Sequence, residues 1–259
     1  MVGDAAKVLK TLGDASIQLI VTSPPYWCIK DYGSPLQIGV TQSYKNYLMS
    51  LAEIWVECVR VLESGCRIAI NVGDQFLRAS ENGGVYCTVP IHADIIRQIM
   101  RLPGMLFLGN IIWRKITTTK TTGGCKWMGS IYYPRDGHIT YEHEYILLFK
   151  KKGKARKHSK SIVALSELTK DQRSLWFRGI WSISPVRQID HPAAFPIELP
   201  ERLIRMFTFY GETVLDPFVG SGTVLAAAQK TGRSGIGIDI EENSVDLCRK
   251  RVNGLSVVL

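Results

Sequence analysis

The sequence predicts an α/β protein built on a mostly parallel β-sheet covered by helices. Strand-like apolar runs alternate with helical patterns along most of the chain, as in parallel sheets joined by crossover helices. Near the C-terminus a unit of about 40 residues reads strand, helix, strand, helix, and a glycine-rich turn joins its first two elements. The 259 residues, of which 46% are hydrophobic, suit one such domain with an inserted module.

The N-terminal part of the chain contains the first strand and the first long helix. Residues 17–22 form a short β-rich run. It is followed by Ser23 and two prolines, which cannot continue a strand. Between residues 43 and 62 apolar side chains recur every three or four positions, which predicts an amphipathic helix with Gly65 just past its end. The same patterns predict three further elements, namely a strand at 67–72, a helix at 91–101 and a strand at 106–113.

The alternation breaks in the middle of the chain. Residues 115–142 are rich in Thr, Gly and Lys and predict a loop. A strand at 143–149 follows and can pair antiparallel with 106–114, so that the loop projects from one edge of the sheet. Residues 151–185 have weak periodicity and predict a small variable module. Regular structure returns with a helix at 199–209, a strand at 213–216, a helix at 223–230, a strand at 235–239 and a helix at 243–252.

Charge and cysteine content narrow the classes of partner. The net charge of +9 and the basic run at 150–160, with seven Lys or Arg and no acid, favour a polyanionic partner, although a solvated loop is the simpler reading of the run. The six cysteines lie far apart without a CxxC pair, which argues against zinc or a disulfide framework and for reduced thiols. No apolar run reaches the roughly 20 residues of a membrane span, and no leader opens the sequence. We therefore expect a cytoplasmic protein with no metal and no membrane contact.

A glycine-rich turn is the first motif that indicates a ligand. Asp216 ends the strand at 213–216, and Gly220 and Gly222 allow a sharp bend close to a ligand. Asp239 ends the next strand, 17 residues after Gly222, and a carboxylate at this position can accept hydrogen bonds from two ribose hydroxyls. The turn lacks the dinucleotide glycine pattern and the Gly-Lys-Ser/Thr of a phosphate loop. A generic nucleotide-type or purely structural turn is the alternative.

The motif Ser23-Pro24-Pro25-Tyr26 follows the first strand. It supplies a hydroxyl, a carbonyl on a backbone stiffened by two prolines, and an aromatic ring. A plain turn or a proline-rich surface ligand is the alternative, which the preceding strand and the distant glycine turn make weaker. Cys28 invites a nucleophile reading, but it follows Trp27 and lies off the motif.

Taken together, these motifs resemble the β group of amino-methylating DNA methyltransferases, in which the catalytic motif precedes the cofactor motif. The resemblance covers nearly the whole chain. It rests on Gly3-Asp4 before a helix, TSPPYW at 22–27, RIAINVGD at 67–74, HEYILLFKK at 143–151, IWSISPV at 180–186, HPAAFPIELPERLI at 191–204, DPFVGSGTV at 216–224 and GIGIDI at 235–240. It implies a Rossmann-like, mostly parallel seven-stranded sheet in permuted order, with helices on both faces and one antiparallel edge strand.

The resemblance also implies S-adenosylmethionine as cofactor. Asp216 is then expected near the methionine ammonium and Phe218 close to the cofactor, which suits a cation better than an anion. Asp239 is expected to hold the ribose, and Asp4 either approaches the adenine or simply caps a helix. The segment 191–196 is expected to shape the methionine side of the pocket. The complete set of expected cofactor-binding residues is Asp4, His191, Pro192, Phe195, Asp216, Phe218, Gly220, Gly222 and Asp239.

For catalysis the resemblance implies that Ser23, Pro24, Pro25 and Tyr26 act on a flipped-out base. The Ser23 hydroxyl and the Pro24 carbonyl are expected to accept hydrogen bonds from the amino group, and the Tyr26 ring to stack on the base. Members with Ser in the first position mostly modify cytosine N4, and those with Asp mostly modify adenine N6. Cytosine N4 is therefore expected here, with adenine N6 as the alternative.

The expected organisation is a catalytic half at 1–114, an edge hairpin and target-recognition region at 115–190, and a cofactor-binding half of the same domain at 191–259. Double-stranded DNA is the expected partner, in a prokaryotic nucleoid, with a homodimer and a separately acting cognate restriction endonuclease as further possibilities. Protein or RNA methylation fits less well, because those relatives usually carry Asn first and place the cofactor motif first. A non-catalytic DNA-binding protein on this fold is a second alternative. The expected DNA contacts are Lys115, Lys120, Lys126, Lys150, Lys151, Lys152, Lys154, Arg156 and Lys157.

Overall fold

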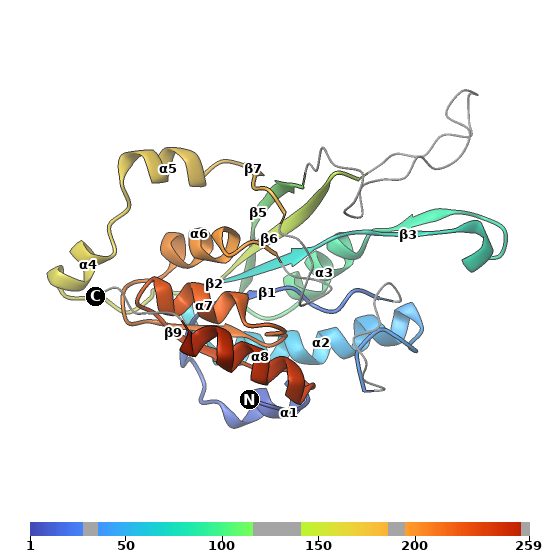
Figure 1. Cartoon of the computed structure of the whole chain (residues 1–259), viewed down its shortest axis with the longest axis horizontal. Helices are drawn as coiled ribbons and strands as arrows, with labels where there is room; N and C mark the ends of the chain where they lie inside the picture. The colour runs from blue at the N-terminus through green and yellow to red at the C-terminus, as the bar shows by residue number, and fades with distance from the viewer. Residues whose placement is uncertain (28–35, 116–140, 186–194, 255–259) are drawn as a thin grey trace.

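The computed structural model describes residues 1–27, 36–115, 141–185 and 195–254. Its centre is a seven-stranded sheet with the order β7-β5-β6-β2-β1-β8-β9 (Figure 1). The strands are β1 (Ile17–Thr22), β2 (Leu62–Val72), β5 (Met105–Arg114), β6 (His143–Lys151), β7 (Ile180–Ser182), β8 (Thr213–Asp216) and β9 (Ser234–Gly237). The prediction of a mostly parallel seven-stranded sheet is confirmed.

Helices cover both faces of this sheet, as predicted (Figure 1). On one face α1 (Ala5–Val8), α2 (Tyr44–Val61) and α3 (Ile91–Met100) pack against β1 and β2 in a core that includes Trp55. On the other face α6 (Glu198–Phe207) and α7 (Thr223–Lys230) bury a second core around Trp113 and Trp181. The last helix, α8 (Glu242–Asn253), lies against α7. None of the helices in the described ranges is long and apolar enough to cross a membrane.

The antiparallel strand is not at the edge of the sheet, which corrects the expectation. β6 pairs antiparallel with both β2 and β5, so it lies between them. The edge belongs to β7, which pairs parallel with β5 through Ile112–Arg114. A strand of three residues is too short to show an alternating pattern, and therefore the sequence did not reveal this outer neighbour.

The strands β1 and β8, which are far apart in the sequence, lie side by side in the sheet. β1 pairs parallel with β2 on one side and with β8 on the other, through Leu19–Val214 and Ile20–Leu215. Parallel strands present their carboxyl ends at the same edge of a sheet. The loop that begins at Ser23 and the turn that begins at Pro217 therefore emerge next to each other.

Three features between the predicted elements were not predicted. After β2 the chain forms a separate hairpin of β3 (Gln75–Leu77) and β4 (Cys87–Val89), with the short helix η2 (Ala79–Glu81) at its turn. The region 151–185 contains α4 (Lys160–Leu165) and α5 (Lys170–Trp176) ahead of β7. After α1, the helix η1 (Leu9–Thr11) leads into the first strand.

Candidate active site

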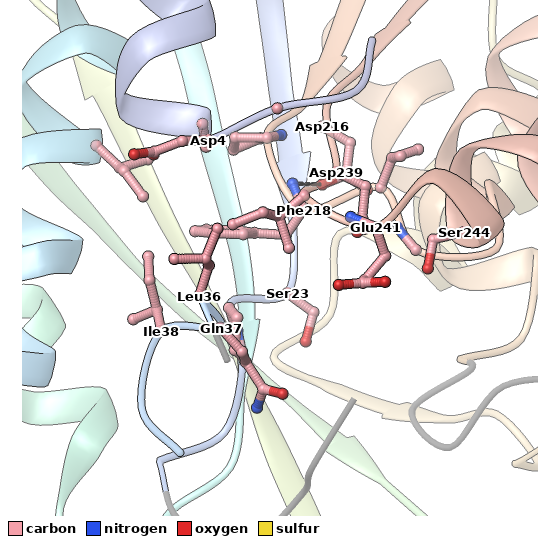
Figure 2. Close-up of a pocket in the computed structure, with 18 of the residues that line it drawn as sticks. Asp4, Ser23, Leu36, Gln37, Ile38, Asp216, Phe218, Asp239, Glu241 and Ser244 are labelled. Carbon is pink, nitrogen blue, oxygen red and sulfur yellow. Dashed lines mark hydrogen bonds between the residues drawn. The ribbon is translucent and has the colours of Figure 1, made fainter. Parts of the chain in front are cut away.

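A cavity of about 300 Å³ opens at the carboxyl ends of β1 and β8, at the small end of the usual range for ligand pockets (Figure 2). Ser23 and Pro25 form part of its wall; they belong to the segment Ser23-Pro24-Pro25-Tyr26, called the proline loop below. Pro217, Phe218 and Gly220 of the glycine turn form another part. The two motifs that the sequence predicts to cooperate thus line one cavity.

The cavity wall is acidic. Five carboxylate side chains line it, namely those of Asp4, Glu53, Asp216, Asp239 and Glu241. Among the described residues no Lys, Arg or His lines it. Such a wall repels phosphates and attracts a ligand with cationic groups and hydroxyl or amino donors. Apolar side chains, among them Leu36, Ile38 and Phe218, offer a surface for a flat aromatic ring. Both features fit S-adenosylmethionine and argue against a dinucleotide.

Asp216 lies at the end of β8 and is almost completely buried, with 2% of its surface exposed. Its Oδ1 accepts hydrogen bonds from the Thr22 hydroxyl, at 2.6 Å, and from the Phe218 amide, at 3.0 Å. Burial raises the pKa of Asp216 to about 7, and the nearby Asp239 adds to the rise, whereas the two hydrogen bonds oppose it. A cation placed beside this carboxyl group therefore favours the ionised form.

This pKa predicts a pH-dependent cofactor affinity. The ionised fraction of a carboxyl group with a pKa near 7 is ~0.1 at pH 6 and ~0.9 at pH 8, so affinity for S-adenosylmethionine should rise roughly tenfold over this range. The ligand-free protein should show the opposite trend, because Asp216 is protonated more readily in the folded than in the unfolded chain. Its contribution to stability is present below the unfolded pKa and is lost as the pH rises towards 7.

Isothermal titration calorimetry at pH 6, 7 and 8 measures the effect, and Asp216→Asn is its control. The asparagine can still accept from Thr22 but does not titrate, while the ligand's own amino group titrates equally in both experiments. An equal pH dependence in the two proteins would contradict the assignment to Asp216.

Asp239 is held by the backbone on both sides. Its Oδ2 accepts from the Gly220 amide at 2.9 Å and its Oδ1 from the Glu241 amide at 3.0 Å, which leaves each oxygen one further acceptor site. The Gly3 amide donates to the Asp239 carbonyl at 2.8 Å, so the N-terminal segment joins the wall. Asp4 caps α1 by accepting from the Ala6 amide, and it also lines the cavity; its approach to the adenine stays a prediction.

Sequence reasoning missed Glu241 and Ser244, which approach the cavity from the start of α8 (Figure 2). They lie two and five residues beyond the strand-end Asp239. The signal was present as a second acid after Asp239, but an exposed acid at the start of a helix is usually a simple helix-dipole contact.

Gly222 has a different role from the one expected. It has a φ of +82°, but it does not line the cavity, and an added Cβ would lie 2.5 Å from Cys248 Sγ and 2.9 Å from Cys248 Cα in α8. Gly222 therefore permits the close approach of α7 and α8, whereas Gly220 faces the cavity.

The proline loop is anchored from two sides. The buried Tyr47 in α2 donates its hydroxyl to the Pro25 carbonyl at 2.9 Å, and the Tyr26 hydroxyl donates to Glu144 at 2.8 Å. Pro24 is buried and does not line the cavity. Within the described residues, no partner is found for the Ser23 hydroxyl or the Pro24 carbonyl.

Four expected site residues lie outside the described residues, namely Lys120, Lys126, His191 and Pro192, and Cys28, which the sequence set aside, lies outside them too. Phe195 is the first described residue of the expected 191–196 segment, and it lines the cavity.

The basic run lies at the far end of the sheet from the cavity. In the strand register Lys150 lies opposite Leu106, near the amino end of β5, and opposite Arg67, in the middle of β2, whereas the cavity lies at the carboxyl ends of β1 and β8. Lys151 Nζ donates to the Val59 and Leu62 carbonyls at the end of α2. Arg156 forms an ion pair with Glu63. Lys152, Lys154 and Lys157 are exposed.

Comparison with known proteins places this architecture in a family. The family model of N6/N4 methyltransferases, described as DNA methylase, matches residues 17–250. The chain belongs to the DNA methylase family. It is 33% identical to the type II methyltransferase M.MjaI of Methanocaldococcus jannaschii, covering 96% of this chain and 89% of the relative. It is also 33% identical to M.MthZI of Methanothermobacter thermautotrophicus, covering 95% and 74% of the two chains.

Solved structures agree with this DNA methylase assignment. TTHA0409 of Thermus thermophilus, complexed with S-adenosyl-L-methionine, is 37% identical with a TM-score of 0.78 and covers 99% of this chain and 96% of its own. The cytosine-N4-specific PvuII DNA methyltransferase shares the fold at 20% identity, with a TM-score of 0.65 and coverage of 99% and 93%. The predicted family and the predicted cofactor are confirmed: the DNA methylase uses S-adenosylmethionine. Within the described ranges, no cluster of three or more His, Cys, Asp or Glu side chains is arranged to hold a metal ion.

Proposed function

We propose that this DNA methylase transfers a methyl group to the exocyclic N4 amino group of cytosine in a flipped-out base. The observation that carries the proposal is the position of Ser23 in the wall of the acidic cavity, beside the glycine turn. A serine in this motif position accompanies cytosine more often than adenine in the family that the motifs resemble. Adenine N6 is the alternative within the same group.

The chemistry requires a nitrogen whose lone pair is free to react. In a base amino group this lone pair is delocalised into the ring. Acceptors that bind both N–H groups favour a pyramidal nitrogen, and we assign this task to the Ser23 hydroxyl and the Pro24 carbonyl. Neither group has a partner within the described residues. Ser23 lines the cavity and is available for the amino group, whereas Pro24 is buried and does not line the cavity.

Bound S-adenosylmethionine supplies an electrophilic methyl group on a sulfonium sulfur. The amino nitrogen would form the new N–C bond with its lone pair as the bond between the methyl carbon and the sulfur breaks, which leaves S-adenosylhomocysteine as the product, and one amino proton would pass to solvent. The Tyr47 contact to the Pro25 carbonyl and the two proline rings hold the acceptors in place during this step. The open cavity argues against a silent scaffold, because no side chain in the described part of the chain fills it.

DNA is expected to approach the carboxyl-end edge of the sheet, where the proline loop lies. Arg114 ends β5 at this edge and is exposed, and it was not among the predicted contacts. Lys115 follows it but is paired with Glu144. That residues 150–157 contact DNA stays a prediction, and their distance from the cavity argues against a contact near the target base.

A paired measurement tests this assignment. Arg114→Gln should weaken DNA binding and lower the slope of log K against log salt by about 0.9, as expected for one lost phosphate contact. Lys154→Gln, the same change in net charge at the opposite end of the sheet, should leave the slope unchanged. Fluorescence anisotropy with unmethylated plasmid fragments at three salt concentrations measures both, and a smaller slope for Lys154→Gln alone would reverse the assignment.

Mass spectrometry of nucleosides tests the proposed reaction. Unmethylated plasmid DNA is incubated with the DNA methylase and isotope-labelled S-adenosylmethionine, and is then digested. Labelled N4-methylcytosine is the expected product. Labelled N6-methyladenine alone would establish the alternative, and unlabelled nucleosides together with cofactor binding would favour a non-catalytic protein.

A further inference from the structure

A buried carboxylate lies directly behind the proline loop and takes no part in the steps above. Glu144 is the second residue of β6 and is 8% exposed. Its Oε1 accepts from the Tyr26 hydroxyl at 2.8 Å and pairs with Lys115 Nζ. Its Oε2 accepts from Asn71 Nδ2 of β2 at 2.7 Å. Three elements from different parts of the sequence therefore meet on one side chain.

The partners of Glu144 fit its charge. A buried carboxylate is costly unless it is paired and hydrogen-bonded, and here Lys115 supplies the charge while Asn71 and Tyr26 supply neutral donors. Asn71 uses only its donor side, because its buried Oδ1 has no partner within the described residues. The burial of Asn71 with an unpaired oxygen is best explained by the hydrogen bond that its Nδ2 donates to Glu144.

The backbone beside this cluster is closely packed. A Cβ added to Gly73 would lie 3.3 Å from Glu144 Cγ and 3.6 Å from Tyr26 Cε1. The glycine thus allows the Glu144 side chain and the Tyr26 ring to lie against the end of β2. A tyrosine ring with a fixed hydroxyl and a wall along its edge has little freedom to turn.

We propose that Glu144 is a positioning residue for the base-stacking ring of Tyr26. It fixes the ring plane through the phenol hydroxyl, while Asn71 and Lys115 fix Glu144. This inference rests on the proposed function, because it assigns to Tyr26 the stacking surface for the flipped base. It also gives Lys115 a role different from the phosphate contact that the sequence predicted.

The orientation of the ring can be measured without turnover. The full-length protein carrying 3-fluorotyrosine at position 26 is examined by ¹⁹F NMR. A fixed ring should give resonances that Glu144→Gln shifts or broadens, because the new amide presents a donor either to Asn71 or to Tyr26 and Lys115. The exchange Asn71→Asp with Glu144→Gln reverses donor and acceptor between the two side chains, and it should restore the original spectrum. An unchanged spectrum in Glu144→Gln would overturn the proposal.

Single-turnover methylation of plasmid DNA then tests whether Glu144 acts through Tyr26. Tyr26→Phe and Glu144→Gln should each slow the reaction about tenfold, and the double variant should be no slower than either. Cofactor affinity should stay at the wild-type value in all three. Multiplying effects, or a Tyr26→Phe rate equal to wild type, would overturn the proposal. Absence of base methylation in the wild-type protein would instead remove the proposed function, while the NMR result still decides the positioning.

Discussion

Ser23→Ala is expected to lower the single-turnover rate of methyl transfer about 100-fold or more while cofactor binding stays intact. In the proposed reaction the hydroxyl is a preorganised acceptor for one N–H of the target amino group, and removing one such group commonly costs 100- to 1,000-fold in rate, or about 3–4 kcal/mol. The side chain lies in the wall of the cavity, but the carboxylates that attract the cofactor are untouched.

Rapid-quench measurement of methyl incorporation gives the rate, and calorimetry with S-adenosylmethionine gives the affinity. Ser244→Ala is the matched control, because it removes the same hydroxyl from the cofactor side of the same cavity. It should change cofactor affinity at most. Wild-type turnover in Ser23→Ala would remove the catalytic role of this residue.

Gly222→Val is expected to abolish cofactor binding by displacing α8 rather than by blocking the ligand. A branched side chain at a φ of +82° costs about 1–3 kcal/mol in backbone strain, and its overlap with Cys248 costs roughly another 1–3 kcal/mol. Displacement of α8 also moves Glu241 and Ser244 away from the cavity. Thermal unfolding and calorimetry should therefore show a lower Tm together with lost affinity.

Gly211→Val separates the two costs. Gly211 has almost the same φ, +81°, but an added Cβ would meet nothing within 4 Å. In the Gly211→Val variant only the backbone strain should lower stability, so we expect a Tm reduced by a few degrees and a cofactor affinity close to wild type. If Gly211→Val lost as much stability as Gly222→Val, the contact with Cys248 would not be the cause.

Most of the sheet was predictable because its strands and helices have strong periodic patterns. The helix predicted at 43–62 and the strands at 17–22 and 213–216 lie within two residues of α2, β1 and β8. What failed were elements without such a pattern. β3, β4 and β7 have three residues each, too few for an alternation to be recognised, so the edge position of β7 could not be predicted.

For the site, sequence reasoning identified residue types but not the partners behind them. The motifs identified Ser23, Asp216 and Asp239, and all three line one cavity in the structure. Nothing in local sequence links Glu144 to Tyr26, because they meet only through the order of the strands. Charge density likewise did not reveal the partners of Lys151 and Arg156, which bond to α2 and to Glu63.

The pairing of β1 with β8 has a consequence for the protein during its synthesis. The proline loop leaves the ribosome well before β8 and β9, between which the glycine turn lies, have been made. A nascent or prematurely terminated chain therefore has acceptor groups for a base and no place for the methyl donor. Because contacts between distant segments form slowly, the cavity between the proline loop and the glycine turn is expected to be completed late in folding.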